Sequence, residues 1–464
     1  MHLRFDRGTL LVDAPRASSA ANLPGLVWDP RVQAFRAPAL RYPELSRAFE
    51  DKVPPRRPLS YRWRPFELRP YQRAAVEAWE GGGHRGLIML PTGSGKTRVA
   101  LSAIERLGVP ALCLVPTIAL LEQWARVLEQ AVEAPIGRLG DGAGRLEPIT
   151  VATYESALRH MPRLGDRFGL LVIDEAHHFG AGRRDEALEM AIAPARLGLT
   201  ATAPKEPAQL ERLRLLIGLP VYERSIGDLA GTYLAPFVRR RQLVELSPDE
   251  RVGYETRLAT FQAFERAFRL RHPNYRWAEL LSEAMNSPAG RRAIFAWREI
   301  QRLLAYSSAK RHELGQLLEA HLGSRILVFC ADNRSAYAIA RQHLLMPITC
   351  DIQREEREAA FVAFARGELR GLVSARVLNE GIDLPSADVA IVVSGAHGNR
   401  EHIQRIGRIL RPQEGKQAVL WELVARGTLE VGWARRRNDG VDSRTSVGAV
   451  DGRLPGRAAL PRTG

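Results

Sequence analysis

One stretch of this sequence, residues 89–97, restricts the local fold more than any other. It reads Met-Leu-Pro-Thr-Gly-Ser-Gly-Lys-Thr, follows a short apolar run at 86–89 and precedes a run of helical periodicity from Arg98 to Arg106. Gly93 and Gly95 allow the backbone to turn tightly, with its N–H groups facing an anion. The stretch therefore predicts a phosphate-binding loop between a strand and a helix.

Two side chains at the end of this loop are of the types that a bound nucleotide needs. We expect Lys96 to reach the β- and γ-phosphates and the Thr97 hydroxyl to hold Mg²⁺. Leu90 stands where the usual motif has its first glycine, so an ordinary strand–turn–helix with a coincidental Gly-Lys-Thr is the alternative. Two further motifs downstream argue against that alternative.

A second apolar run ends in two adjacent carboxylates. Leu-Val-Ile at 171–173 is followed by Asp174 and Glu175. We expect Asp174 to bind Mg²⁺ and Glu175 to orient and deprotonate the attacking water, because γ-phosphoryl transfer depends on positioning and charge neutralisation. The alternative, a strand that runs into a polar loop, is weakened by the phosphate-binding loop that precedes it.

A third motif lies far downstream, at residues 404–412. Arg405, Arg408 and Arg411 recur every third residue, so they share one face of a helix. A solvated basic face is the usual explanation of such a triplet, but the apolar residues beside it indicate a packed segment. An arginine that reaches the γ-phosphate contributes roughly 10³–10⁵ in rate, and one supplied by a second domain would act only when the domains close.

Together these residues resemble the motifs of a superfamily 2 helicase, and further segments agree in order and spacing across residues 66–412. The segments that resemble the family's motifs are 68–72 ahead of the phosphate-binding loop, 114–117 with Leu120 and Gln123 (motif Ia), 153–156 (motif Ib), 199–202 (motif III), 326–330 (motif IV), 377–385 (motif V) and 404–412 (motif VI).

The resemblance implies roles for individual residues. Gln72 would read adenine, Asp383 would contact the ribose, and Gln404 would link the nucleotide state to motif III, with Arg408 and Arg411 as the arginines that reach the γ-phosphate. The implied ATP-binding residues are Arg69, Gln72, Pro91, Thr92, Gly93, Ser94, Gly95, Lys96, Thr97, Gly381 and Asp383. The implied nucleic-acid contacts are Pro116, Thr117, Thr153, Tyr154 and Asn333.

Within the superfamily the chain resembles XPB-type DNA repair helicases in their short archaeal and bacterial form. Three features carry this resemblance: the Asp-Glu-Ala-His-His-Phe run at 174–179, a thumb-like segment from Pro248 to about Ser308, and motif VI at 404–411. Lys205-Glu206-Pro207 departs from the family's Arg-Glu-Asp, which is implicated in unwinding, and Ala375 replaces a threonine common in DEAD-box relatives.

The resemblance implies an ATP-dependent DNA helicase or translocase of 3′ to 5′ polarity that acts in DNA repair of the nucleotide-excision type. Two alternatives stay open because of Lys205-Glu206-Pro207. One is a translocase that moves on duplex DNA without unwinding it and serves a nuclease partner. The other is an ATP-gated DNA-binding clamp whose hydrolysis only resets binding.

The order of apolar and helical runs predicts an α/β fold. Apolar runs at 86–89, 112–115, 149–152 and 170–173, and again at 325–329, 371–374, 389–393 and 417–422, alternate with helical stretches, which indicates two mostly parallel sheets. By resemblance these are two tandem RecA-like domains. We expect a small N-terminal module at 1–60, domain 1 at 61–230, domain 2 at 231–425 with a helical thumb-like insertion at about 248–306, and a basic flexible tail at 426–464. The module resembles the N-terminal damage-recognition domain of archaeal XPB proteins, with a structural cap on the first motor domain as the alternative.

Composition bears on the partner and on the location. The net charge of +15 over 464 residues favours a polyanion, although an arginine-rich coding bias is an alternative source of that charge. Binding through phosphates would be sequence-independent. The N-terminal residues lack the apolar region of a signal peptide, and no run approaches the length of a membrane span. We therefore expect a cytoplasmic, nucleoid-associated monomer that binds DNA, with a possible nuclease or repair partner and no membrane contact.

Overall fold

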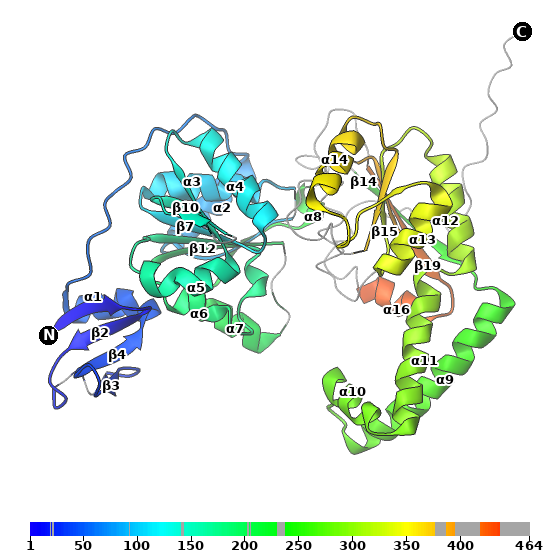
Figure 1. Cartoon of the computed structure of the whole chain (residues 1–464), viewed down its shortest axis with the longest axis horizontal. Coiled ribbons are helices and arrows are strands. Elements are labelled where there is room, and N and C mark those ends of the chain that lie inside the picture. The colour runs from blue at the N-terminus through cyan, green and yellow to red at the C-terminus, as the bar shows by residue number, and fades with distance from the viewer. Residues whose placement is uncertain are drawn as a thin grey trace, which may run out of the picture. The chain divides into compact units, whose positions relative to one another are not determined.

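The computed structural model describes residues 1–18, 20, 23–91, 93–140, 143–201, 204, 206–229, 237–375, 387–394 and 418–436. These residues form two compact units, one from Met1 to Ser225 and the other from Ile226 onward (Figure 1). The first unit contains a five-stranded and an eight-stranded sheet, and the second contains a six-stranded sheet.

The N-terminal module is built on the five-stranded sheet, with strand order β3-β4-β2-β1-β5. Its strands are β1 (His2–Asp6), β2 (Thr9–Asp13), β3 (Val27–Asp29), β4 (Ala34–Pro38) and β5 (Glu50–Asp51), with the helices η2 (Ala39–Arg41) and α1 (Tyr42–Ala48). The alternating residues 3–12, interrupted by Arg7-Gly8, form the antiparallel hairpin β1–β2. Arg7 and Gly8 both have positive φ, 48° and 86°, which suits the tight turn of a hairpin.

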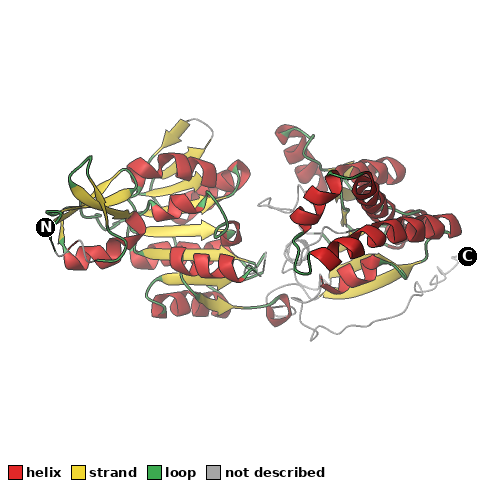
Figure 2. Cartoon of the chain, turned by 90° about the horizontal axis from the view of Figure 1, so that it is seen from below, coloured by secondary structure: helices red, strands yellow, loops and turns green. Residues whose placement is uncertain are grey.

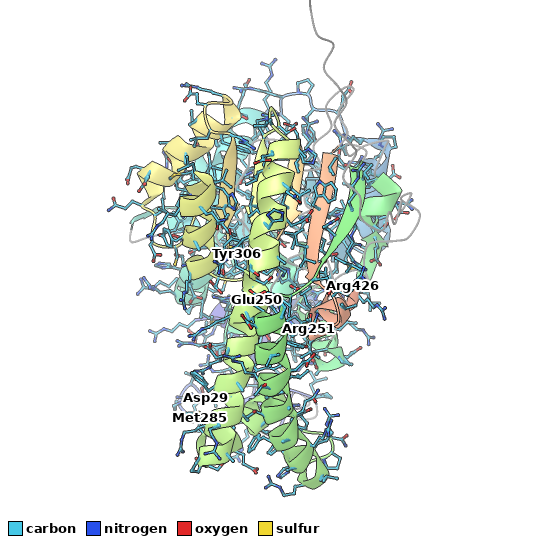
Figure 3. All side chains as sticks on the ribbon, turned by 90° about the vertical axis from the view of Figure 1, so that its right-hand side faces the viewer. Asp29, Glu250, Arg251, Met285, Tyr306 and Arg426 are labelled. Carbon is cyan, nitrogen blue, oxygen red and sulfur yellow. The ribbon has the colours of Figure 1, made fainter. Side chains whose placement is uncertain are left out.

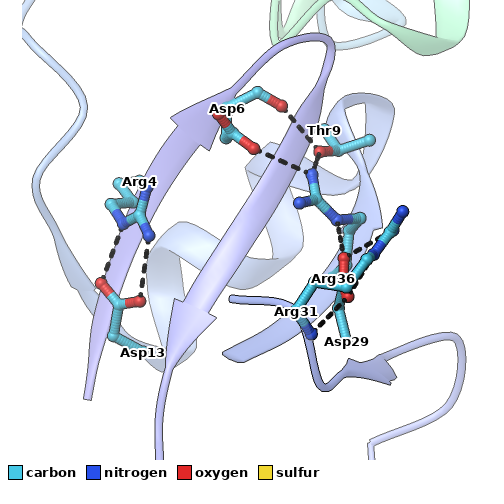
Figure 4. A network of polar contacts seen from close by, with 7 residues as sticks. All are labelled: Arg4, Asp6, Thr9, Asp13, Asp29, Arg31 and Arg36. Carbon is cyan, nitrogen blue, oxygen red and sulfur yellow. Dashed lines mark hydrogen bonds and ion pairs between the residues drawn. The ribbon is translucent and has the colours of Figure 1, made fainter. Parts of the chain in front are cut away.

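An ion-pair network ties the strands of this module together (Figure 4). Arg36 donates to Asp6 at 3.0 Å and to Asp29 at 3.1 Å, and Arg31 donates to Asp29 at 2.9 Å. The hydrogen bond from Arg31 is the main reason why the pKa of Asp29 lies well below its ordinary value. Strands β1, β3 and β4 are thus joined by side chains as well as by the backbone ladder.

The module packs directly on the eight-stranded sheet domain. Ile192, which belongs to that domain by sequence, is fully buried in the module's own hydrophobic core with Leu3, Leu10 and Phe35. Gly165 permits the close approach, since a Cβ there would lie 2.8 Å from the Phe5 ring and closer still to a backbone carbonyl. The two sheets of the first unit therefore share part of one core.

The eight-stranded sheet has the order β13-β6-β12-β11-β7-β10-β8-β9 and is parallel except for the pair β8–β9 (Figure 2). Its strands are β6 (Arg85–Met89), β7 (Ala111–Val115), β8 (Ile136–Gly140), β9 (Ala143–Arg145), β10 (Ile149–Thr153), β11 (Leu170–Asp174), β12 (Ala195–Thr200) and β13 (Pro220–Glu223). The associated helices are α2 (Pro70–Gly81), α3 (Lys96–Leu107), α4 (Ile118–Ala131), α5 (Tyr154–Leu164), η3 (Ala176–His178), α6 (Asp185–Glu189) and α7 (Pro207–Leu216). All four strands predicted here from apolar runs are confirmed.

The six-stranded sheet of the second unit is parallel throughout, with the order β14-β19-β18-β15-β17-β16. Its strands are β14 (Phe237–Val244), β15 (Ile326–Phe329), β16 (Met346–Pro347), β17 (Gly371–Ser374), β18 (Val389–Val392) and β19 (Ala418–Ala425). The helices α8 (Ile226–Leu229), α12 (Ser308–Ala320), α13 (Asn333–His343) and α14 (Arg354–Ala365) belong to this unit. The four apolar runs predicted here as strands are again strands.

The thumb-like segment is helical, as predicted, and consists of α9 (Pro248–Arg271), α10 (Trp277–Met285) and α11 (Pro288–Ala305). Glu250 closes the first turn of α9 through the Ser247 backbone and also accepts from Ser308 at the start of α12, at 2.8 Å. Arg251 donates to the Arg426 carbonyl at 2.7 Å, which attaches the base of α9 to the end of β19 (Figure 3). Phe261 and Phe268 of α9 are buried, so these aromatic side chains belong to the core.

The start of the C-terminal tail is folded, which corrects the expectation of a flexible tail for residues 426–436. Helix α16 (Leu429–Arg436) follows β19, and its Glu430 forms a buried ion pair with Lys310 of α12 at 2.7 Å. The charge composition of the tail could not reveal that Glu430 pairs with Lys310, which lies far away in sequence. Residues 437–464 lie outside the described residues.

No helix within the described ranges is long and apolar enough to cross a membrane.

Candidate functional site

The phosphate-binding loop connects β6 to α3, as the sequence predicts. Gly93 and Gly95 have φ values of 84° and 78°, a conformation that glycine adopts without strain. A Cβ at Gly95 would in addition lie 2.6 Å from the amide nitrogen of Gln72. The two glycines are thus required by conformation, and Gly95 also by space.

Polar groups of this loop meet at the N-terminus of α3. Lys96 and Thr97 are the first residues of α3 and are half-buried. The Lys96 ammonium donates to the Leu90 carbonyl at 3.2 Å, and the Ser94 hydroxyl donates to the Pro91 carbonyl at 2.7 Å. A helix N-terminus with a lysine beside it is suited to bind phosphate.

The segment implied to read adenine is bound to this loop. Gln72 is buried; its side-chain oxygen accepts from Arg69 N at 2.9 Å, and its amide donates to Ser94 O at 2.8 Å. Tyr71 donates its hydroxyl to the same Ser94 carbonyl at 2.5 Å. The residues around Arg69 and those of the loop therefore form one connected structure at the start of α2.

The carboxylates predicted at the end of β11 are buried together. Asp174 and Glu175 are 8% and 9% exposed. Asp174 accepts from Trp124 Nε1 at 2.9 Å and from Glu175 N at 3.0 Å. Burial, and then repulsion by Glu175, raise the pKa of Asp174 to about 6, and the positive charge of Lys96 opposes this rise. The structure thus brings Lys96, Asp174 and Glu175 into one site.

The second carboxylate has spare capacity to accept a hydrogen bond. Glu175 Oε2 is buried without a hydrogen-bond partner among the described residues. It lies 3.4 Å from His177 Nδ1, which is itself 3.1 Å from the Thr200 hydroxyl of motif III. Glu175 has a φ of 51°, a backbone conformation that costs energy outside glycine and recurs at functional sites. A water molecule could occupy the free acceptor position.

The arrangement fits a divalent cation. Two desolvated carboxylates that repel one another, and a threonine hydroxyl in the first turn of α3, are oxygen ligands of the kind that Mg²⁺ prefers. Asp174 and Thr97 are the residues that would hold the ion. When bound, it would neutralise charge on the phosphates.

The segments expected to contact nucleic acid follow neighbouring strands of the first sheet. Pro116 and Thr117 follow β7, and Thr153 ends β10, which is paired with β7. Thr117 and Thr153 accept hydrogen bonds from Leu120 N and Ser156 N, so each caps the helix that follows. Asn333 begins α13 in the second unit, where its amide contacts Cys350 Sγ at 3.0 Å.

Tyr154 requires a correction. Its side chain is only 2% exposed, and its hydroxyl donates to the backbone carbonyls of Asp174 and Glu175, the latter at 3.3 Å. The side chain therefore does not reach the surface to contact nucleic acid. At the start of α5 the ring of Tyr154 points into the domain. Membership of a sequence motif does not by itself determine whether a side chain points inward or outward.

Other predicted site residues fall outside the described residues. These are Thr92, Gly381, Asp383, Gln404, Arg408 and Arg411. Lys205 is outside them as well. Glu206 occupies the N-cap position of α7 without a side-chain capping bond, and Pro207 is the first residue of the helix, where the missing N–H of proline costs nothing.

Sequence reasoning missed two side chains that touch the acidic pair. Trp124 was part of the apolar periodicity of α4, and Tyr154 was read as a nucleic-acid contact. A tryptophan directly after Gln123 of motif Ia could have suggested a buried N–H in need of an acceptor, but nothing in the sequence identifies Asp174 as that acceptor.

Family models divide the chain in the same way as its sheets. Residues 3–53 match the xeroderma pigmentosum group B helicase damage recognition domain, 65–205 match the type III restriction enzyme res subunit, and 309–413 match the helicase conserved C-terminal domain. The helicase domain of Hef from Pyrococcus furiosus has a similar structure, with a TM-score of 0.53, 19% identity, and coverage of 79% of this chain and 97% of that chain. Two parallel sheets carrying these motifs define a superfamily 2 helicase fold.

Full-length relatives identify the family. The chain is 34% identical over 447 residues to the DNA 3′-5′ translocase XPB2 of Sulfurisphaera tokodaii, which covers 95% of this chain and 100% of that protein. It is 32% identical to the DNA 3′-5′ helicase XPB of Mycobacterium tuberculosis, over 82% of this chain and 64% of that protein. The chain belongs to the XPB family of DNA helicases and translocases.

Proposed function

We propose that this protein is an ATP-driven motor that moves on DNA with 3′ to 5′ polarity and acts in DNA repair. The observation that carries the proposal is the site at the end of β11, where Lys96, Asp174 and Glu175 meet and Glu175 Oε2 remains free to accept from a water. The printed activities of the relatives, a DNA 3′-5′ translocase and a DNA 3′-5′ helicase, support the substrate and the polarity.

Each candidate site residue of the first unit would have its own task in hydrolysis. Gln72, held by Ser94 O and Arg69 N, would accept or donate at the adenine edge. Lys96 and the N–H groups at the start of α3 would bind the phosphates, and Glu175 would take the proton of the attacking water. Preorganisation of these groups lowers the barrier because little reorientation is needed during reaction.

The second unit would supply the remaining groups. We propose that Gln404, Arg408 and Arg411 act on the γ-phosphate side and that Gly381 and Asp383 contact the ribose; these residues lie outside the described ranges. An arginine in this role stabilises the charge of the transition state and contributes roughly 10³–10⁵ in rate. Its contribution would depend on closure of the two domains around ATP·Mg²⁺.

DNA would be held by its backbone. Net charge +15 favours a polyanion. We propose Pro116, Thr117, Thr153 and Asn333 as contacts, each near the start of a helix. Such contacts carry no base information, so binding would be independent of sequence and weakened by salt. We further propose that the motor works as a monomer on chromosomal DNA in the cytoplasm, with a nuclease or another repair protein as its partner.

A second candidate, translocation on duplex DNA without unwinding, is favoured by one observation. Pro207 occupies the first turn of α7 at the place where the family carries an acid implicated in strand separation. The same residues would hydrolyse ATP in either case. The two candidates differ only in what the motion does to the duplex.

The deciding experiment measures the ATPase rate of the full chain alone, with single-stranded DNA, with duplex DNA and with RNA. Stimulation by DNA and not by RNA is the expected result, and stimulation by RNA or by neither polymer would overturn the proposal. Strand displacement then distinguishes a helicase from a translocase, which would displace only the third strand of a triplex.

A further inference from the structure

Two buried side chains connect the acidic pair to the helices that begin at the expected nucleic-acid contacts. Trp124 belongs to α4, which starts after Thr117, and Tyr154 is the first residue of α5, which starts after Thr153. Both donate hydrogen bonds to the residue pair Asp174–Glu175. No intervening residue separates either helix from the acidic pair.

The bond from Trp124 reaches the carboxylate itself. Trp124 is 2% exposed, and its indole N–H donates to Asp174 Oδ2 at 2.9 Å. An indole N–H is a donor only, and a donor to an ionised acceptor makes a strong, directional hydrogen bond. A shift or rotation of α4 would therefore change the position of Asp174.

The bond from Tyr154 reaches the backbone beneath both acids. Its hydroxyl donates to the carbonyls of Asp174 and Glu175, and its ring packs edge-on against Phe179 at 4.8 Å. Arg184 lies over the same ring at 5.8 Å. The turn that carries Glu175 is thereby clamped between α5 and the segment that follows η3.

A buried tryptophan needs an acceptor in any protein, so the choice of acceptor is the informative feature. Trp79, in the same domain, is fully buried and donates to the Arg196 carbonyl at 3.0 Å, an ordinary backbone acceptor. Trp124 instead donates to a carboxylate that the proposed function places at the metal.

We propose that Trp124 and Tyr154 are positioning residues that transmit engagement of nucleic acid at the starts of α4 and α5 to Asp174 and Glu175. The proposal rests on the function proposed above and adds the physical connection by which DNA would stimulate hydrolysis. DNA bound at Thr117 and Thr153 would set the two helices, and the helices would set the acids. Without DNA the same bonds would hold the acids in a less reactive arrangement.

The test uses Trp124→Phe and Tyr154→Phe, which remove one donor each and retain an aromatic ring. Trp79→Phe is the matched control, since it removes a donor and the same bulk from another buried position of the same domain. For each full-length protein, kcat and KM for ATP are measured with and without saturating duplex DNA, together with DNA affinity and Tm. We expect kcat with DNA to fall about tenfold more than kcat without it in Trp124→Phe, the size expected for loss of a hydrogen bond to a charged group. The difference should be smaller in Tyr154→Phe, because the acceptors of Tyr154 are backbone carbonyls. DNA affinity and KM should stay within about twofold.

Several outcomes separate this proposal from its premise. If wild-type protein is stimulated by DNA and the test variants keep the same stimulation ratio as Trp79→Phe, transmission through these side chains is overturned while the motor stands. An equal fall in kcat with and without DNA also overturns it, since that is the behaviour of a residue that only shapes the site. Lack of stimulation of the wild type by any DNA overturns the motor and the transmission together. A lowered Tm shared by Trp79→Phe and Trp124→Phe, with the ratio reduced only in the latter, supports it.

Discussion

The acidic pair of the first unit differs from the buried acids of the second unit in its ion pairing. In the second unit, Glu430 pairs with Lys310 at 2.7 Å, and Glu422 pairs with Arg239 at 2.7 Å. In the first unit, Asp174 and Glu175 are buried side by side without an arginine or lysine ion pair among the described residues. A buried carboxylate with a cation stabilises the fold that holds it, whereas a buried pair of carboxylates stores repulsion that a metal and a water can relieve.

The strand ends of the two sheets show the same contrast. Asp174 ends β11 and accepts from a distant indole, which leaves Asp174 oriented but not used in capping. Asp332 follows β15 and caps α13, where its carboxylate accepts from Ser335 N at 2.7 Å. An aspartate at or just after the end of a parallel strand therefore belongs to a buried acidic pair in one unit and caps a helix in the other.

The largest expected effect is loss of hydrolysis in Lys96→Ala. Removing the ammonium leaves the phosphates without their cation, so the ATPase rate should fall at least about 10²–10³-fold. DNA binding, measured by fluorescence anisotropy, should be retained, because Lys96 is not among the proposed nucleic-acid contacts. Wild-type turnover by this variant would show that the loop from 89 to 97 does not bind phosphate in the reaction.

Glu175→Gln should lower kcat by about 10²–10⁴-fold, since the amide cannot take a proton from water. It also removes one of two repelling charges, so Tm should stay equal or rise. Nucleotide affinity, measured by titration with a fluorescent ATP analogue, should change little. A large fall in Tm alongside the loss of activity would mean that Glu175 is a structural acid like those of the second unit.

Lys310→Met tests the other half of the contrast. It leaves Glu430 charged, buried and unpaired, which costs about 3–5 kcal/mol when one partner of a buried pair is removed. The urea midpoint for unfolding of the second unit should therefore fall. The proposed catalytic residues of the first unit should be unaffected. Arg302→Met, which breaks the exposed pair with Glu299, is the control and should cost about 1 kcal/mol or less. Equal losses of unfolding free energy in both variants would contradict the inference that burial makes the Lys310–Glu430 pair matter more.

Asp332→Ala should have the smallest effect. Loss of the helix cap should destabilise the protein by about 1 kcal/mol, and Asp332→Ser should restore most of this because serine caps equally well. The basal ATPase rate should be unchanged in both variants. A loss of activity in Asp332→Ala that serine does not restore would place this carboxylate in the chemistry rather than in capping.

Much of the first unit could be predicted from sequence because its signals are local. The strands β6, β7, β10 and β11 are continuous apolar runs, and the phosphate-binding loop is a contiguous motif.

Strand β14 of the second unit was not predicted, because its three arginines at 239–241 hide the apolar pattern and its pairing partner, β19, lies far away in sequence. Its place at an edge of the sheet allows such charges.

The contacts that organise the candidate site are less predictable. Trp124 and Asp174 are far apart in sequence, as are Lys310 and Glu430, and periodicity shows only that such residues lie on a buried face. Which buried atom meets which is decided by the packing of whole elements. Tyr154 illustrates the limit: its motif position suggested the surface, and the structure turns it inward.

The burial of Ile192 in the core of the N-terminal module has a consequence for folding during synthesis on the ribosome. The N-terminal module emerges first, yet its core includes a residue encoded well after the phosphate-binding loop and the acidic pair. The module can form its hairpin early, but the part of its core that Ile192 completes stays open until most of the following domain has been translated. The nascent chain therefore exposes an apolar surface for much of its synthesis, and a protein truncated before Ile192 should depend on chaperones or aggregate.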